Sequence, residues 1–418
     1  MSLTPQQVDI IRSTALVLQE HGNAITTSFY DTLLKEAPDL NNVFNQANQR
    51  NNHQAQALAG ALYAYASHID DLGTLSPAVE KICQKHASLY IMPHQYKVVC
   101  EYLLRAMGDV LGAALTKEIL DAWGAAYWQL ANLMIEREEQ LLQDAEDWTD
   151  WRHFRIEDKI KESAEITSFY LKPVDGQKLP PYKPGQYVSV LMDVPQIQYL
   201  QSRQYSLSDA PNPDYYRVSI KKDEGLNVSQ PDAEAHPGFI SNIMHDVKNV
   251  GDVIKVSHPA GDFFLDSEHN TDVPIVLFSA GVGLTPMMSI LNTLVSRNTT
   301  SPQRISFIHG ARTTVVQGFG KHVRATADQN PDVTASIFVK SPDMRTDIEG
   351  VDFHHVGRVR LDVLDRSKDL YLYDKGTRYF VCGPDSFMAD VHEGLRNLGV
   401  EDERIMMEVF GTGHVPKA

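Results

Sequence analysis

Two glycine-containing turns in the C-terminal part of the chain have the composition of a phosphate site. The first is Ala280 followed by Gly281-Val282-Gly283-Leu284-Thr285-Pro286, which lies between an apolar strand-like segment and a helix-like one. Glycines let a backbone approach a phosphate closely, and the N–H groups at a helix start attract its charge. The second turn, Cys382-Gly383-Pro384, also follows a predicted strand. Open α/β sheets bind nucleotides at this end of their strands, so we predict that both turns hold a nicotinamide dinucleotide.

The alternative is a pair of tight turns with no ligand, because a Gly-x-Gly pair alone is weakly specific. The order strand, Gly-x-Gly-x-Thr-Pro and helix, with the second turn further on, favours the dinucleotide. The choice between NADH and NADPH stays open. Arg312 lies just past the next predicted strand, where it would meet a 2′-phosphate, but an ordinary surface arginine fits that position equally well.

Two further motifs precede these turns in a fixed order. Pro184-Gly185-Gln186-Tyr187 opens a predicted strand, and Arg203-Gln204-Tyr205-Ser206 follows it. The pair resembles the ferredoxin-NADP reductase family, in which the second motif binds a flavin. By this resemblance Arg203 would pair with the FAD pyrophosphate, Tyr187 and Tyr205 would offer ring faces or hydroxyls to the flavin, and Ser206 would lie near its reactive nitrogen.

The resemblance also implies a second pyrophosphate contact and a flavin cover. Gly238-Phe239-Ile240-Ser241 precedes a helix-like segment, whose N–H groups would hold the pyrophosphate. The rival segment is Gly225 to Ser229, and we prefer Gly238 and Ser241 because a helix follows them. Near the end of the chain, Phe410 would pack on the flavin and Glu408 would lie between flavin and haem. A plain C-terminal strand is the alternative for these last two residues.

His86 lies in an apolar helical stripe with Val79, Ile82, Cys83 and Leu89. A histidine in such a stripe is more often a core residue than a ligand. The other residues of the pattern change this interpretation. The chain resembles the bacterial and fungal flavohaemoglobins over essentially its whole length. The residues of the N-terminal part that carry the resemblance are Tyr30, Phe44, Gln54, Leu58, His86, Tyr96 and Glu138.

This resemblance implies that His86 is the proximal ligand of the iron of a haem b. Tyr30, Gln54 and Leu58 would line the distal side, and Phe44 would pack against the haem.

The second ring nitrogen of His86 would donate to a network of Glu138 and Tyr96, which makes the ligand more basic. His53 is the competing distal residue, but the family register turns Gln54 inward. Lys85 would contact a haem propionate or reach Glu408, and a solvated lysine is the alternative.

Three kinds of element must position these residues. The chain up to about residue 145 has helical periodicity, with Thr4-Pro5-Gln6-Gln7 as a helix start. Short alternating strands then predict an antiparallel β-barrel, and buried strands alternating with helices predict a doubly wound α/β domain. We therefore predict a multidomain chain: an all-α globin (1–147), an FAD-binding β-barrel (148–268) and an NAD(P)-binding α/β domain (269–418).

Composition restricts the partners. The 418 residues include 54 acidic and 38 basic ones, and the formal net charge is −16. This balance argues against nucleic acid and against an anionic membrane surface. The three cysteines, Cys83, Cys100 and Cys382, form no CxxC pair and fit a reducing compartment. No secretory signal is visible and no apolar run approaches the roughly 18 residues of a membrane span, so a soluble, cytoplasmic protein is expected.

The resemblance implies a nitric oxide dioxygenase that works on O₂ and NO. Electrons would pass from NAD(P)H to FAD and from FAD to haem iron within the one chain, with no protein partner required. Two rivals remain: an oxygen-binding or sensing globin that its reductase keeps ferrous, and a haem-dependent peroxide reductase.

Overall fold

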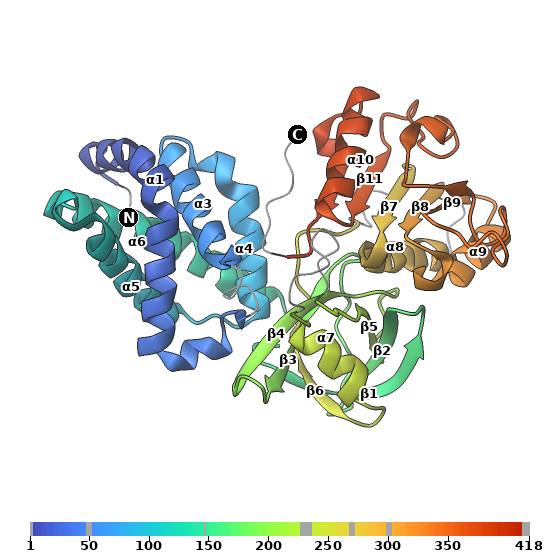
Figure 1. The fold of residues 1–418 in the computed structure, drawn as a ribbon, viewed down its shortest axis with the longest axis horizontal. Coiled ribbons are helices and arrows are strands. Elements are labelled where there is room, and N and C mark those ends of the chain that lie inside the picture. The colour runs from blue at the N-terminus through green and yellow to red at the C-terminus, as the bar shows by residue number, and fades with distance from the viewer. Residues whose placement is uncertain are drawn as a thin grey trace. The chain divides into compact units, whose positions relative to one another are not determined.

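A computed structural model describes residues 3–46, 52–145, 148–225, 236–266, 272–297 and 303–411. The chain divides into two compact units (Figure 1). The first contains residues 1–152, 189–203 and 256–262, and the second contains 153–188, 204–255 and 263–418.

Helices dominate the first unit. They are α1 (Pro5–Glu36), α3 (His53–Ser67), α4 (Ser76–Ser88), α5 (Pro93–Leu111) and α6 (Lys117–Asp144). Short 3-10 turns cover Pro38–Asn42, Leu72–Leu75 and Gly112–Ala114. Their apolar faces meet in one core, which includes Ile11, Ile25 and Phe29. The all-α prediction for this part is thus confirmed.

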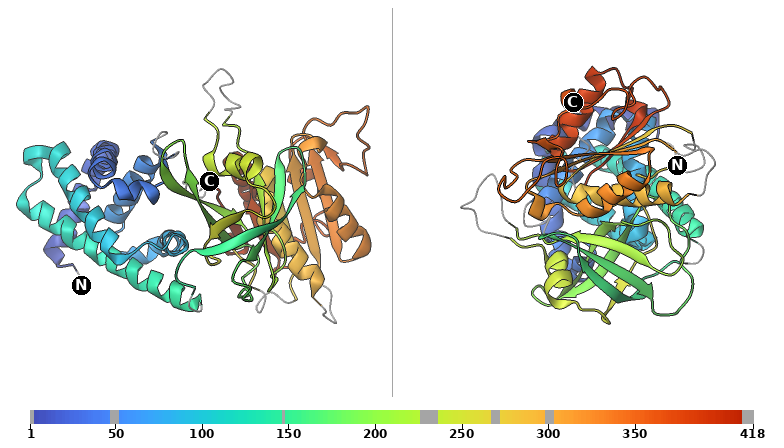
Figure 2. Two further views of the ribbon diagram at one scale, coloured as in Figure 1. Left: turned by 90° about the horizontal axis from the view of Figure 1, so that it is seen from below. Right: turned by 90° about the vertical axis from the view of Figure 1, so that its right-hand side faces the viewer.

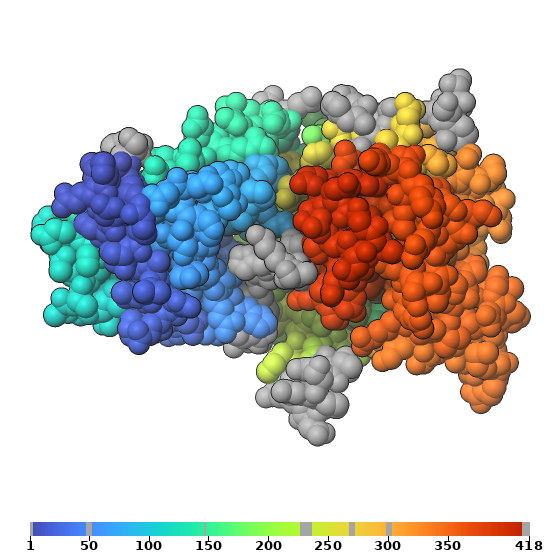
Figure 3. Space-filling view, turned by 90° about the horizontal axis from the view of Figure 1, so that it is seen from above, coloured from blue at the N-terminus to red at the C-terminus, as the bar shows by residue number. Residues whose placement is uncertain are grey.

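Helix α1 begins where the sequence predicts. Thr4 accepts from the N–H of Gln7, whose side chain accepts from the N–H of Thr4 in return, and Pro5 occupies the first turn. The helix then runs without interruption to Glu36. Gly22 lies within it, and a Cβ there would lie 3.4 Å from the Cβ of Ala59 on α3. Helices α1 and α3 therefore pack against each other at this point, and the dark and lighter blue surfaces of this region adjoin in Figure 3.

Pro93 is the first residue of α5 and lies in its first turn. Proline is well tolerated at this position. The reason is that proline lacks only an N–H, which has no helical partner in the first turn, and its fixed φ suits that position. Tyr96 consequently lies in the first turn of α5.

The first sheet has six strands in the order β4-β3-β6-β1-β2-β5 (Figure 1). Its strands are β1 (Arg152–Lys161), β2 (Ile166–Pro173), β3 (Tyr187–Val194), β4 (Tyr199–Ser206), β5 (Tyr216–Lys221) and β6 (Val253–Val256). The pairs β1–β2 and β2–β5 are antiparallel. This agrees with the predicted fold class of the middle part. A short helix, α7 (Phe239–Asn242), follows Gly238 and continues into a π-helical turn, Ile243–Val247.

The second sheet is parallel, in the order β10-β9-β8-β7-β11-β12. Its strands are β7 (Ile275–Ala280), β8 (Ile305–Ala311), β9 (Val333–Val339), β10 (His355–Val356), β11 (Arg378–Cys382) and β12 (Ile405–Glu408). Helices α8 (Leu284–Ser296) and α9 (Gly320–Gln329) cover one face, and α10 (Asp385–Asn397) covers the other (Figure 2). The doubly wound prediction is confirmed.

Strand β7 lies between β8 and β11, so the chain leaves it toward one edge and later returns toward the other. This reversal is the topological switch point where such sheets bind ligands. The predicted boundaries at 147/148 and 268/269 involve residues 147, 268 and 269, which lie outside the described residues, and remain predictions. Within the described ranges, no helix is long and apolar enough to cross a membrane.

Candidate functional site

Three side chains from three helices of the first unit meet around one imidazole. His86 lies in the last turn of α4, Tyr96 in the first turn of α5 and Glu138 near the end of α6. Nδ1 of His86 lies 2.8 Å from Oε1 of Glu138 and 2.9 Å from the hydroxyl of Tyr96. The Tyr96 hydroxyl also donates to Oε1 of Glu138 at 2.6 Å. The helix ends therefore bring together the three residues that the sequence predicted as a group.

The chemistry of this triad fixes the proton of the imidazole. A carboxylate only accepts, so Nδ1 of His86 carries the proton and Nε2 keeps a lone pair. Burial, and then the charge of Glu138, raise the pKa of Tyr96, so its hydroxyl stays a donor. An imidazole whose other nitrogen donates to a buried carboxylate is the usual arrangement of a metal-ligating histidine.

The donor set fits an iron that brings its own equatorial ligands. Among the described residues, no group of three or more His, Cys, Asp or Glu side chains could hold a bare metal ion. A single histidine with a lone pair on Nε2 suits a haem, in which the porphyrin supplies the remaining nitrogens.

The predicted distal residues also lie in the first unit. Tyr30 is on α1 with only 6% of its surface exposed, and its ring packs edge-on against Phe29 and Phe44. Its hydroxyl forms a hydrogen bond with the side chain of Gln54, while burial, the larger effect, raises the pKa of Tyr30.

Leu58, on α3 with Gln54, packs against the same core as Tyr30. His53, the competing distal residue, is exposed. This places Gln54, rather than His53, toward Tyr30.

Two cations of the first unit influence each other. Burial, and then the positive charge of Arg203, lower the pKa of Lys85. Lys85 precedes His86 on α4, and Arg203 lies on β4, where it donates to the carbonyl of Ser202 at 2.6 Å. Two such cations fit an anionic group, such as a phosphate or a carboxylate.

The predicted flavin residues occupy β3, β4 and the turn before β3. Gly185 has φ of +113°, and a Cβ there would lie 2.7 Å from the carbonyl oxygen of Phe263, so the Pro184-Gly185 turn requires glycine. Tyr187 is the first residue of β3 and is half-buried. Gln204 and Tyr205 are half-buried on β4, which ends at the buried Ser206.

The segment Gly238–Ser241 makes its contacts with the nearby residue Asp223. Ser241 Oγ accepts from the N–H of Asp223 at 3.3 Å, and a Cβ on Gly238 would lie 2.8 Å from Oδ2 of Asp223. The helix that was expected after Gly238 is present as α7, but it has only four residues. Of the rival segment 225–229, residues 226–229 lie outside the described residues, so the pyrophosphate contact of Gly238 and Ser241 stays a prediction.

The two glycine turns of the second unit touch each other. A Cβ on Gly283 would lie 2.3 Å from the carbonyl oxygen of Cys382 and 2.8 Å from the N of Gly383, so only glycine fits. Gly281 has φ of +55°, which also favours glycine. Their strands, β7 and β11, are neighbours on either side of the switch point. The structure thus joins two motifs that are about a hundred residues apart into one edge of the sheet, as open α/β sheets require at a nucleotide site.

The remaining residues of these turns lie at the same edge. Leu284, Thr285 and Pro286 are buried in the first turn of α8, and the Thr285 hydroxyl donates to the carbonyl of Val282 at 3.1 Å. Pro384 precedes the first residue of α10.

Glu408 is buried at the end of β12, in register with Cys382 on β11, while Phe410 exposes 45% of its surface. Arg312 forms an exposed ion pair with Glu165, an arrangement that its sequence context did not predict.

The sequence did not single out a partly exposed polar network of the second unit. Asn292 on α8 donates from Nδ2 to Oδ1 of Asp209 at 2.7 Å and accepts from His322 on α9 at 2.8 Å. In the sequence, the network is signalled by Asn292, an amide side chain in the otherwise mostly apolar helix α8.

Known protein families match both the helical N-terminal part and the parallel-sheet part of the chain. Residues 27–134 match the globin family, and residues 277–393 match the oxidoreductase NAD-binding domain family. The flavohemoprotein of Bordetella parapertussis is 44% identical over 418 residues, which is 99% of this chain and 100% of that protein. The chain belongs to the flavohemoprotein family.

Two solved structures agree with this membership. The flavohemoglobin of Malassezia yamatoensis, a crystal structure with bound FAD and heme, is 27% identical with a TM-score of 0.83 and covers 98% of this chain and 100% of its own. The FAD/NAD-binding domain of nitric oxide dioxygenase from Vibrio cholerae is 34% identical with a TM-score of 0.53 and covers 63% of this chain and 99% of its own. This flavohemoprotein is therefore an oxidoreductase-family chain with globin and reductase modules in one polypeptide.

Proposed function

We propose that this flavohemoprotein is a nitric oxide dioxygenase that holds haem b, FAD and NAD(P)H. The observation that carries the proposal is the His86–Glu138–Tyr96 triad in a chain whose other half has the paired dinucleotide turns. A histidine made strongly donating by a buried carboxylate suits activation of a diatomic ligand better than its storage. In such a protein the bound groups supply hydride acceptance, single-electron transfer and the oxidation of NO by O₂ to nitrate.

On the proximal side, His86 would bind the iron through Nε2, and Glu138 and Tyr96 would fix the orientation of its ring. Glu138 exposes only 4% of its surface, so its charge acts on the imidazole with little screening by water. Lys85 and Arg203 would compensate the negative charge of a propionate or of the FAD pyrophosphate.

On the distal side, Tyr30 would donate from its hydroxyl to the ligand of the iron, with Gln54 supporting the phenol. Its raised pKa keeps the hydroxyl protonated, as a donor must be. Phe44, which packs edge-on against Tyr30, would line the haem.

In the reductase half, Gly281, Gly283, Thr285 and the Cys382-Gly383-Pro384 turn would hold the dinucleotide. Tyr187, Arg203, Tyr205 and Ser206 would hold FAD, and Phe410 would cover the flavin. Because both modules are in one chain, we propose that electron transfer needs no separate protein. We also propose a cytoplasmic location, as the cysteine content suggests.

The test is to supply NAD(P)H, NO and O₂ labelled with ¹⁸O to the purified protein. A dioxygenase places both atoms of one O₂ in the product, so nitrate should carry two labelled oxygens. An oxygen-storage globin would form no more than one nitrate per haem, without sustained turnover. A peroxide reductase would oxidise NAD(P)H with a hydroperoxide and leave NO unconsumed. Either of these results, or nitrite as the product, would contradict the proposal.

A further inference from the structure

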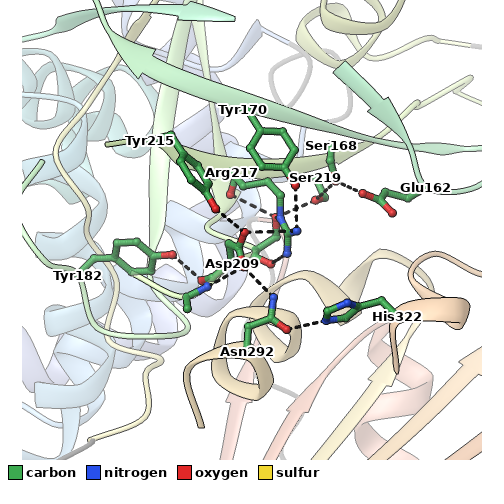
Figure 4. A network of polar contacts seen from close by, with 12 residues as sticks. Glu162, Ser168, Tyr170, Tyr182, Asp209, Tyr215, Arg217, Ser219, Asn292 and His322 are labelled. Carbon is green, nitrogen blue, oxygen red and sulfur yellow. Dashed lines mark hydrogen bonds and ion pairs between the residues drawn. The ribbon is translucent and has the colours of Figure 1, made fainter. Parts of the chain in front are cut away.

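Asn292 lies between Asp209 and His322 in a polar network of the second unit (Figure 4), in which Asp209 and Asn292 are half-buried and His322 is exposed. Asp209 follows β4, three residues after Ser206, while Asn292 and His322 belong to the helices α8 and α9 of the parallel sheet. The network therefore joins the end of a predicted flavin strand to the helix that begins at the dinucleotide turn.

The donors and acceptors of Asp209 and His322 allow only one orientation of the Asn292 side-chain amide. The Asp209 carboxylate only accepts, so the NH₂ group of Asn292 must face it. The amide oxygen of Asn292 then faces His322, whose Nε2 must carry a proton. Partial desolvation, and then the charge of Arg217, lower the pKa of His322, which favours a neutral ring. The contact of Nε2 with the amide oxygen places the proton of that ring on Nε2. Each member thus determines the orientation of the next.

Asp209 is itself held firmly. Its Oδ2 accepts from the hydroxyl of Tyr215 at 3.1 Å and lies 3.4 Å from Nη1 of Arg217. Its backbone carbonyl accepts from the hydroxyl of Tyr182 at 2.5 Å. Arg217 is buried and donates from Nε to Ser208 at 3.2 Å. Figure 4 shows these side chains converging on Asp209, which makes it a fixed anchor for Asn292.

Helix α8 transmits this anchoring to the dinucleotide turn. Its residues from Leu284 to Leu291 are buried, so the helix is packed as one rigid rod. Asn292 lies roughly 12 Å along the helix from Leu284, at 1.5 Å per residue. A shift at Asn292 therefore moves Thr285 and Pro286 as well, and with them the place where a nicotinamide would bind.

We propose that Asn292, held between Asp209 and His322, is a positioning residue that sets where α8 presents the dinucleotide to the flavin, and so sets the rate of hydride transfer. This inference rests on the proposed function for the identity of the two cofactors. The nicotinamide loses a hydride, two electrons and one proton, to the flavin, and Asn292 would act on this transfer only through the position of α8.

The experiment measures flavin reduction by NADH in the full-length, cofactor-loaded protein by anaerobic stopped-flow absorbance. Asn292→Ala should lower the limiting rate constant about tenfold, because small misplacements of reacting groups cost one to two orders of magnitude. The NADH concentration at half-maximal rate should change less than the limiting rate does. FAD content and the flavin spectrum should stay those of the wild type. Thr293→Ala is the matched control, since its hydroxyl donates within α8, to the carbonyl of Ser289 at 2.7 Å.

Two further variants keep the test decisive if Asn292→Ala folds poorly. His322→Leu removes the donor that orients Asn292 and should also slow flavin reduction, whereas His322→Gln supplies an amide donor and should restore most of the rate. In a double-mutant cycle, Asp209→Ala combined with Asn292→Ala should be no slower than the slower single variant. The same variants should shift the urea midpoint of unfolding non-additively.

A limiting rate within about twofold of that of Thr293→Ala would overturn the proposal, as would equal rates for the two His322 variants. The assay contains neither NO nor O₂. A flavohemoprotein that forms no nitrate could therefore still show the predicted loss, so failure here and failure of the proposed function are distinguishable.

Discussion

Oε1 of Glu138 lies 2.8 Å from Nδ1 of His86, although the two residues are 52 positions apart in the sequence and lie on different helices. The contact leaves Nε2 of His86 with a lone pair and directs a buried negative charge at the ring. Both effects favour a strongly donating metal ligand.

Replacing Glu138 with Gln should weaken this donation. We expect the midpoint potential of the haem iron to rise by roughly 60–120 mV, which corresponds to the 10- to 100-fold effects typical of such partners. Spectroelectrochemical titration measures it. Glu139→Gln is the control, because Glu139 is exposed on the same helix. A potential unchanged from that of the control would show that Glu138 does not tune the iron.

Replacing His86 with Ala should abolish stable haem ligation and leave FAD in place, since the two cofactors use different residues. The absorption spectrum of the purified protein shows both, as a lost Soret band beside a retained flavin band. His94→Ala, which changes an exposed histidine of α5, should keep both bands. If His86→Ala retained the wild-type Soret band, another residue would have to be the ligand.

Replacing Tyr30 with Phe removes one distal hydroxyl and keeps the ring packing. A hydrogen bond to a charged partner contributes about 1.5–3 kcal/mol. O₂ should therefore leave the reduced protein roughly 10- to 150-fold faster, at a factor of ten per 1.36 kcal/mol. Stopped-flow dissociation measures this rate, and flavin reduction by NAD(P)H should not change.

Tyr63→Phe is the matched control for Tyr30, because Tyr63 is exposed on α3. An O₂ dissociation rate of Tyr30→Phe equal to that of this control would assign Tyr30 to the core. Gln54 or His53 would then have to be the distal donor.

The stability of the second unit should depend on His309. Burial lowers its pKa to about 4, and in the unfolded chain the pKa lies near 6.5. As the pH falls, the unfolded state therefore binds the proton first. The contribution of neutral His309 to the free energy of unfolding is therefore complete above about pH 6.5. It is lost as the pH falls toward 4, and the total loss is about 3 kcal/mol.

Urea unfolding near pH 7.5 and pH 5 measures this dependence. His309→Gln should lose less stability between the two pH values than the wild type. His153→Gln, which changes an exposed histidine of β1, should keep the wild-type pH dependence. An equal loss in wild type and His309→Gln would remove His309 as the cause.

Periodicity and local motifs predict much of the fold. Helix α1 begins at the predicted start Thr4-Pro5-Gln6-Gln7, and β3 opens with Tyr187 at the end of the Pro184-Gly185-Gln186-Tyr187 motif. Contacts between turns that are far apart in the sequence are harder to predict. The two glycine turns could nevertheless be placed side by side, because parallel strands align their carboxyl ends. The contact between Gly283 and Cys382 then follows from the neighbouring positions of β7 and β11.

The network around Asp209 could not be predicted in this way. Asp209 and Asn292 are 83 positions apart, and each alone is typical of an ordinary turn or helix residue. Their contact depends on how α8 packs, which no local pattern encodes. A proline can likewise end one segment or begin the next, and Pro93 begins α5.

The central claim is tested most directly by counting nitrate formed for each NADH consumed when NO and O₂ are supplied together. The dinucleotide gives two electrons and each NO needs one to reach nitrate with O₂, so the wild type should form about two nitrates per NADH. His86→Ala should form none while still passing electrons from NADH to an artificial acceptor. NADH oxidation by the wild type without nitrate, or nitrate formation at the wild-type rate by His86→Ala, would contradict the account.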